Sequence, residues 1–429
     1  MKFVIGNGIL TDGVSKFWEN GAILIEDGKI AQVGDTGAVR PKADEFIDVK
    51  GRLILPGFVN FHHHLYSSLA VGISPVGPTK NFVEILQNLW WRLDKALDEE
   101  SVYFSALAGL IDAVMHGVTT VFDHHASMNF VRGSLKTIED AFNRLGMKGV
   151  LCFEVSDRTG PGDAVAHIDE NIEFFDAHRD SFKIKGMMGL HANFTLSDET
   201  LRIVAERRPK DMPIHIHCGE DRYDLEFCLS LGYDGVVHRL DRFGLIDDRS
   251  ILAHAIHLTD RDLEIIRSKD PIIASNPESN ANNQVGQMDR TLIQKFVLGT
   301  DGMSNDMVQT LRSLYLLGHG HKEDFEQLRS VFFSYRYEAM ARFFPEWRPL
   351  SVGAPADIVV LEYIPNTPIS LENILGHLIF GAKTAKAFMT VVDGQILYHD
   401  GKFKGIDLDE AADGIRKAAN HLWSKYFAK

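Results

Sequence analysis

Cysteine is scarce in this chain of 429 residues, in which only Cys152, Cys218 and Cys228 occur. Three cysteines give no disulfide framework and no paired Cys-x-x-Cys zinc motif. Uninterrupted apolar runs of 18 residues are also missing, so the sequence predicts no membrane span. Residues 1–8 have the pattern of a short strand and turn and lack the pattern of a signal peptide. We therefore expect a cytoplasmic protein that does not bind membranes.

Positive charge is in deficit. Lys and Arg number 45 against 59 Asp and Glu, which leaves a formal net charge of −14. A broad nucleic-acid surface needs clustered Lys and Arg, so we expect no nucleic-acid partner. The overall charge does not exclude an anionic substrate, because one pocket can differ in charge from the whole surface.

Short strand-like runs fill residues 1–56 and return near the C-terminus. In both regions an Asp-Gly pair separates two such runs, which is a strong signal for a β-hairpin. The two pairs are Asp27-Gly28 and Asp393-Gly394. This shared pattern predicts one small β-sandwich domain built from residues 1–56 and 346–405. Residues 406–429 predict a separate C-terminal helix.

Between these segments, residues 57–345 alternate apolar strand-like runs with helical stretches. Such alternation predicts an α/β fold with a parallel sheet. A polar residue ends most of the runs, and this favours a (β/α)₈ TIM barrel, whose active site lies at the C-terminal ends of its strands. The runs include residues 118–123, 186–190, 214–217, 250–254 and 296–301.

Three consecutive histidines, His62, His63 and His64, follow an apolar run that begins after Pro56-Gly57. In an extended chain, alternate side chains point to the same side. His62 and His64 can therefore reach one metal ion while His63 faces away. Neutral imidazole is a common ligand of zinc and iron. A solvated, histidine-rich strand end is the alternative interpretation.

Later strand ends carry further polar groups. His217 and His254 each end an apolar run, Glu220 follows His217 by three residues, and Asp301 precedes Gly302. Taken singly, each has an ordinary explanation, namely a buried core histidine, a solvated loop glutamate or a turn aspartate. Three histidines and one aspartate together could form a metal site that leaves a position open for water.

The motifs also resemble those of a known family. Residues 56–64 (PGFVNFHHH), His217-x-x-Glu220, His254 and residues 275–280 (SNPESN) occur in its order. They are followed by residues 299–302 (GTDG) and 353–359 (GAPADIV). The set resembles the amidohydrolase superfamily, in its deaminase and chlorohydrolase (ATZ/TRZ-like) branch. Residues 81–94 and 376–381 are most similar to SsnA-type aminohydrolases. The resemblance covers nearly the whole chain, but its motifs are much less specific for a substrate.

This resemblance implies a barrel with a β-sandwich and one divalent metal ion per chain. Zinc is the first expectation, with iron or manganese as alternatives. The implied ligands are His62, His64, His217 and Asp301.

The resemblance also implies roles for the neighbouring residues. Glu220 would be the proton shuttle, His254 would help to orient the hydroxide, and Asp301 could accept a proton. His191 matches a position that often touches substrate, and we expect Asn280, near the mouth of the pocket, to contact substrate as well.

Related enzymes differ from this chain in two ways that bear on the site. Some bridge two metals with a lysine on the fourth strand, but here that strand ends in His191, and Lys183 and Lys185 lie at its start. We therefore expect one metal. Many relatives have Arg-Gly soon after the histidine strand, where this chain has Val71-Gly72. A substrate anion or carbonyl that such an arginine would bind must therefore be bound by another residue, or be absent.

The expected activity is hydrolytic deamination of a purine-, pterin- or triazine-like heterocycle by a metal-bound hydroxide. Dehalogenation or opening of a cyclic amide at the same site is the alternative, and the released product would distinguish them. A metal-binding scaffold without turnover is disfavoured, because a scaffold would not need Glu220. We expect Trp90-Trp91 to serve helix packing rather than ring stacking. A homodimer is suggested by the resemblance alone.

Overall fold

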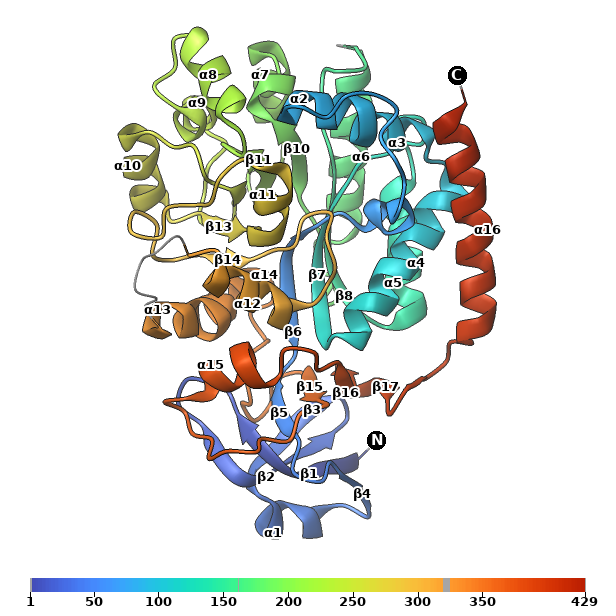
Figure 1. Cartoon of the computed structure of the whole chain (residues 1–429), viewed down its shortest axis with the longest axis vertical. Helices are drawn as coiled ribbons and strands as arrows, with labels where there is room; N and C mark the ends of the chain where they lie inside the picture. Colours follow the sequence, from blue (N-terminus) through green and yellow to red (C-terminus); the bar gives the residue numbers. More distant parts are fainter. Residues whose placement is uncertain (1, 161, 319–324, 429) are drawn as a thin grey trace.

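The computed structural model describes residues 2–160, 162–318 and 325–428. Figure 1 shows two parts, a sheet that contains the N-terminus and a larger part in which helices surround the strands. Helix α16 (Leu408–Phe427) runs along one side of the larger part. Within the described ranges, no helix is both long and apolar enough to cross a membrane.

Strands from both ends of the chain share one nine-stranded sheet. Its order is β18-β17-β16-β15-β5-β1-β2-β3, and β4 pairs with β1. The N-terminal strands are β1 (Lys2–Thr11), β2 (Phe17–Glu26), β3 (Lys29–Asp35), β4 (Glu45–Asp48) and β5 (Leu53–Pro56). The C-terminal strands are β15 (Ile358–Leu361), β16 (Ala387–Val392), β17 (Gln395–His399) and β18 (Lys402–Phe403). The antiparallel β5–β15 pair joins the two halves, so hydrogen bonds run through the whole sheet.

The two predicted hairpins are confirmed. The Asp-Gly pairs connect β2 to β3 and β16 to β17, and both residues of each pair have positive φ. Positive φ at both central positions is the geometry of a type I′ turn, whose twist matches that of the flanking strands. Apolar residues from both halves then form one core, in which Ile23 and Ile25 of β2 belong with Met389 and Val391 of β16.

The larger part contains two parallel sheets. The first holds β6 (Phe58–His63), β7 (Val118–His125), β8 (Lys148–Phe153) and β9 (Ile184–Gly186). The second holds β10 (Met188–Ala192), β11 (Ile214–Cys218), β12 (Ile251–His254), β13 (Ile272–Ser275) and β14 (Val297–Leu298). The longer helices between them are α4 (Glu99–Met115), α5 (Ser134–Leu145), α6 (Asp163–Ala177), α7 (Asp198–Arg207), α8 (Arg222–Ser230), α9 (Val236–Arg242), α10 (Asp260–Lys269) and α11 (Pro277–Asn283), and α12 (Met307–Leu316) follows β14. Helices α13 (Phe325–Ser330) and α14 (Arg336–Phe343) follow β14, and α15 (Ile374–Gly376) lies between β15 and β16. Parallel strands alternating with helices give a TIM-barrel-type fold.

Two isolated parallel bridges lie between these sheets. One pairs His63 at the end of β6 with Asp301, and the other pairs Val155 with Leu190 of β10. The chain enters β6 from the nine-stranded sheet through Gly57, where β6 and β7 approach closely. A Cβ at Gly57 would lie 2.3 Å from Cγ2 of Thr119, so this position needs glycine.

Helix α16 packs against α4 and against α3 (Trp91–Ala96). The indole of Trp423 donates a hydrogen bond to the carbonyl of Leu69 at 2.7 Å, and the Tyr426 hydroxyl donates to the carbonyl of Asn88 at 3.0 Å. In return, Nε of Arg92 donates to the carbonyl of Tyr426 at 2.6 Å. The C-terminal helix therefore holds the segment that follows β6 and continues into α3.

A buried ion-pair cluster joins the nine-stranded sheet to the larger part. Nζ of Lys148, at the start of β8, lies 2.6 Å from Oδ2 of Asp357 and 2.5 Å from Oδ1 of Asp393. Burial opposes charge on the lysine, but the two carboxylates raise the pKa of Lys148 above its ordinary value. The lysine is thus charged, and it neutralises carboxylates that would otherwise repel each other.

Replacing Lys148 by alanine should destabilise the protein by about 3–5 kcal/mol, because two carboxylates would lose their buried counter-ion. Chemical denaturation monitored by circular dichroism would measure this loss. Lys136→Ala is the matched control, since Lys136 pairs with Asp140 on the surface, and exposed pairs contribute about 0–1 kcal/mol. Equal losses in the two variants would show that the buried cluster has no special weight.

Candidate active site

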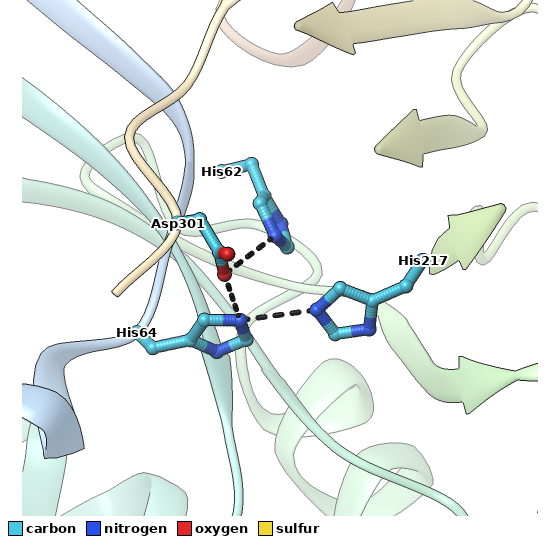
Figure 2. A group of neighbouring side chains, drawn as sticks. All are labelled: His62, His64, His217 and Asp301. Carbon is cyan, nitrogen blue, oxygen red and sulfur yellow. Dashed lines mark hydrogen bonds and ion pairs between the residues drawn. The ribbon is translucent and has the colours of Figure 1, made fainter. Parts of the chain in front are cut away.

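The four predicted metal ligands lie together at the C-terminal ends of the strands. His62 is the last residue but one of β6 and His64 directly follows that strand, His217 comes from β11, and Asp301 follows β14 (Figure 2). Nε2 of His64 lies 2.8 Å from Oδ1 of Asp301 and 3.0 Å from Nε2 of His217. Nε2 of His62 lies 3.5 Å from the same Asp301 oxygen.

These donor atoms fit one small cation. Tetrahedral zinc with bonds of about 2.0–2.1 Å would separate neighbouring donors by about 3.3 Å. The separations of 2.8, 3.0 and 3.5 Å are close to this value, and all four donor atoms lie within 4.8 Å of one another. Nε2 of His62 is buried and has no hydrogen-bond partner among the described residues. A cation would satisfy this atom and relieve the close contact between the two other imidazoles.

The charge balance of the site also favours a cation. Burial opposes charge on His64, but the hydrogen bond and the charge of Asp301 raise the pKa of His64 to about 9. The carboxylate therefore attracts positive charge to the position that the imidazole nitrogens face.

His63 faces away from this group, as the strand alternation predicts. Its Nδ1 lies 2.9 Å from Oγ1 of Thr300, and its Nε2 lies 3.2 Å from Nδ2 of Asn305. Both partners belong to the segment around Asp301, so His63 helps to hold that segment against β6.

Glu220 lies beside the four ligands. Its Oε1 accepts a hydrogen bond from Nδ2 of Asn283 at 3.2 Å, and its Oε2 lies 3.6 Å from Nε2 of His254. Burial, followed by the negative charge of Asp301, raises the pKa of Glu220 well above its ordinary value. The protonated acid is thereby favoured, which suits a group that delivers a proton.

His254 and Asp301 have left-handed backbone conformations, with φ of 72° and 52°. Such values are uncommon outside glycine and tend to occur at functional sites. Nδ1 of His254 lies 2.7 Å from Oδ1 of Asn280, and the Ser279 hydroxyl donates to Oδ2 of Asp301. Helix α11 thus supports both residues.

Asn280 lies behind His254, fully buried, and it is absent from the residues that line the adjoining pocket. Asn280 is therefore placed to hold the ring of His254 and not to contact substrate, as we had predicted it would. Ser279, Asn282 and Asn283 line the pocket from the same helix instead.

A pocket adjoins the metal position, and three of the four ligands, His64, His217 and Asp301, line it. His191, at the end of β10, lines it as predicted, and its Nδ1 lies 2.7 Å from Oγ1 of Thr195. Trp90 and Trp91 also line it, although the sequence favoured helix packing for both. The remaining aromatic and apolar lining residues are Tyr66, Phe82, Leu86 and Met303.

Sequence analysis missed three charged residues in this pocket, Asp94, Glu154 and Arg158. Nη1 of Arg158 donates to Oδ2 of Asp94 at 2.5 Å, and Nη2 donates to Glu154. Burial raises the pKa of Asp94 to about 7, although the charge of Arg158 opposes this rise. Glu154 and Arg158 follow β8, so recognising residues 148–153 as a strand would have placed both at the C-terminal end of the barrel.

Val71, which stands where many relatives have an arginine, does not line this pocket. Val71 is 83% exposed and lies outside the pocket wall, so it does not stand where an arginine would meet substrate. Arg158 brings a guanidinium into the pocket from another strand end.

The whole chain was compared with known protein families and structures. A family model described as "Amidohydrolase family" matches residues 53–397. The chain belongs to the amidohydrolase family. As an amidohydrolase it is an enzyme, a hydrolase that acts on carbon–nitrogen bonds.

Curated relatives of this amidohydrolase align over almost the full length. The chain is 27% identical to a 5-methylthioadenosine/S-adenosylhomocysteine deaminase of Thermococcus sibiricus, over 92% of this chain and 94% of the relative. It is 28% identical to a 5′-deoxyadenosine deaminase of Methanocaldococcus jannaschii, over 90% and 92%. An adenosine deaminase from Xanthomonas campestris, solved with bound zinc, has the same fold, with a TM-score of 0.84 at 19% identity over 98% of each chain.

Elemental analysis of the fully active amidohydrolase should find about one divalent ion per chain. The four donors surround a single position, and no lysine within the described ranges lines the pocket where a bridging ligand would be needed. Two tightly held ions, with activity following the second, would contradict this prediction.

Proposed function

We propose that this amidohydrolase is a metal-dependent deaminase that acts on an adenosine-type nucleoside, with zinc as its metal. The observation that carries the reaction class is the position of Glu220, a buried carboxyl with a raised pKa that lines the pocket together with the ligands His64, His217 and Asp301. The substrate class is supported by relatives whose names specify 5-methylthioadenosine, S-adenosylhomocysteine and 5′-deoxyadenosine.

The protein residues supply the proton transfers. Bound metal contributes Lewis-acid activation of a water molecule. Glu220 then donates a proton to the ring nitrogen beside the carbon that carries the amino group, while oxygen adds to that carbon. Asp301 accepts the proton from the water, and His254 orients the attacking oxygen. The proton held by Asp301 passes through Glu220 to the amino group, the carbon–nitrogen bond breaks, and ammonia leaves. The remaining proton of the added oxygen goes to Glu220, which restores both carboxyl groups, and the ring keeps a carbonyl.

The far wall of the pocket suits the polar half of a nucleoside. Oδ1 of Asp94 and Nε of Arg158 are buried and have no hydrogen-bond partner among the described residues. The first can accept a hydrogen bond from a sugar hydroxyl, and the second can donate one to an oxygen. Trp91 and Leu86 offer apolar surface nearby, which suits a small 5′ substituent. We propose His191 as a further contact to the substrate.

An ammonia-release assay across a panel of heterocycles tests this proposal. Metal-reconstituted enzyme would be given adenosine, 5′-deoxyadenosine, 5′-methylthioadenosine, guanine, a pterin and a chlorotriazine. We expect ammonia and the matching inosine-type product, with the highest kcat/KM among the adenosine derivatives. Chloride release alone, or ring opening without ammonia, would replace deamination with the alternative chemistry, and better turnover of guanine or the pterin would refute the nucleoside assignment.

We also propose that the two parallel sheets close into one (β/α)₈ barrel over residues 57–345. The bridges of His63 with Asp301 and of Val155 with Leu190 support this closure. A β domain from residues 1–56 and 346–405, a homodimeric assembly and a cytoplasmic location stay predictions.

A further inference from the structure

The three histidine ligands differ in what holds their second ring nitrogen. Each turns Nε2 toward the shared metal position, which leaves Nδ1 pointing outward. Nδ1 of His64 meets the carbonyl of His124 at 2.5 Å, and Nδ1 of His217 meets the carbonyl of His191 at 2.8 Å. These two partners belong to the backbone, so the fold itself fixes the orientation of both rings.

The third ligand has a side-chain partner. Nδ1 of His62 lies 2.8 Å from Nε2 of His215, another imidazole. The ring centroids of His62 and His215 are 5.0 Å apart at an interplanar angle of 63°. The orientation of His62 therefore depends on a residue that can be changed without altering the backbone.

His215 is placed by the alternation of β11. It precedes His217 by two residues, so both side chains point to the interior of the barrel, with His215 one layer deeper. Only 1% of its surface is exposed, and it does not line the pocket. His215 is thus shielded from substrate and acts only through His62.

Binding of a cation through Nε2 of His62 gives this hydrogen bond one direction. An imidazole that binds a cation through Nε2 must carry its proton on Nδ1. Nδ1 of His62 then donates, and Nε2 of His215 must be the acceptor. This arrangement leaves the proton of His215 on its own Nδ1, which is buried and has no hydrogen-bond partner in the described part of the chain.

Such an unpaired donor is unfavourable, since a buried polar group without a partner loses the hydrogen bond that it would make with water. The opposite tautomer of the pair would put a proton on Nε2 of His62 and block the metal position. The arrangement that leaves all three Nε2 atoms available for a cation therefore carries one unpaired donor, at Nδ1 of His215.

We propose that His215 is a positioning residue that fixes the tautomer and ring orientation of His62 and thereby sets the affinity of the site for its metal. Partners of this kind typically contribute about 10–100-fold to metal affinity. The proposal concerns metal binding alone, so it stands even if the enzyme acts on a substrate other than a nucleoside.

Two substitutions of His215 separate the hydrogen bond from the bulk of the ring. His215→Leu fills much of the space but offers no acceptor, whereas the amide oxygen of His215→Gln can reach Nδ1 of His62. Zinc affinity would be measured by competition with a chelator, and the Co²⁺-substituted protein would report ligand geometry through its visible absorption spectrum. We expect about a 10–100-fold loss and an altered spectrum for leucine, and recovery of most of the affinity for glutamine.

His167→Leu is the matched control, because His167 is also a fully buried imidazole but belongs to helix α6, away from the four ligands. Wild-type affinity and spectrum in His215→Leu would overturn the proposal. So would an equal loss in His167→Leu, or a failure of glutamine to improve on leucine. If His215→Leu does not fold, His215→Asn replaces it, because the shorter asparagine amide does not reach Nδ1 of His62. Equal zinc affinities in His215→Asn and His215→Gln would then overturn the proposal.

Discussion

Turnover should fall by about 10²–10⁴-fold when Glu220 is replaced by glutamine, while the metal content stays at the wild-type level. Glutamine keeps the size of the side chain and can still accept the hydrogen bond from Asn283. It cannot carry the proton that the raised pKa of Glu220 retains. Steady-state kinetics and elemental analysis on the same preparation would measure both quantities.

Turnover and metal content together distinguish a proton donor from a metal ligand. Loss of metal in Glu220→Gln would identify Glu220 as a ligand. Glu220, His254 and Asp301 do form a second group of possible donors, in which Oε2 of Glu220 lies 3.6 Å from Nε2 of His254. Full activity with full metal content would remove Glu220 from the proton path. Asn282→Ala is a useful control, because it changes the pocket wall on the same side without removing an ionisable group.

Replacing His217 by alanine should remove metal and activity together. The imidazole contributes one of four donors and lies 3.0 Å from His64, so its loss leaves a three-donor site and a gap beside it. Activity should drop to the level of the metal-free enzyme and return in part when zinc is added in excess. Chelator competition and kinetics measured across zinc concentrations would show both effects.

His257→Ala is the control for the His217 prediction. His257 follows His254 by three residues, and its Nε2 donates to the carbonyl of Val285 at 3.0 Å, outside the pocket wall. We expect it to keep its metal. If His217→Ala retains one tightly bound ion and normal turnover, His217 is not a ligand and the four-donor site is wrong.

Much of the site could be predicted from the sequence because its residues end strands. His62, His64, His217 and Asp301 each follow an apolar run, and parallel strands bring such ends to one edge. The hairpins could be predicted for a similar reason, since Asp-Gly tolerates positive φ at both positions of a tight turn.

The contacts between distant segments could not be predicted in this way. Arg158 meets Asp94 across 64 residues, and neither residue lies in a pattern with a fixed period. Asn280 occurs in a recognisable motif, but whether it faces the pocket or His254 depends on the rotation of α11. The position of Val71 could not be predicted either, because closeness in sequence to the histidine strand does not decide whether a side chain reaches the pocket.

The hydrogen bonds between helix α16 and the segment after β6 have a practical consequence for handling the enzyme. Nη2 of Arg92 donates to the carbonyl of Ala428 at 2.5 Å, and the neighbouring Trp91 forms part of the pocket wall. A purification tag or fusion partner joined after α16 would lie beside this contact, whereas the N-terminus lies in the nine-stranded sheet at the opposite end of the molecule (Figure 1). Kinetic constants compared between laboratories should therefore come from protein tagged at the N-terminus or not at all.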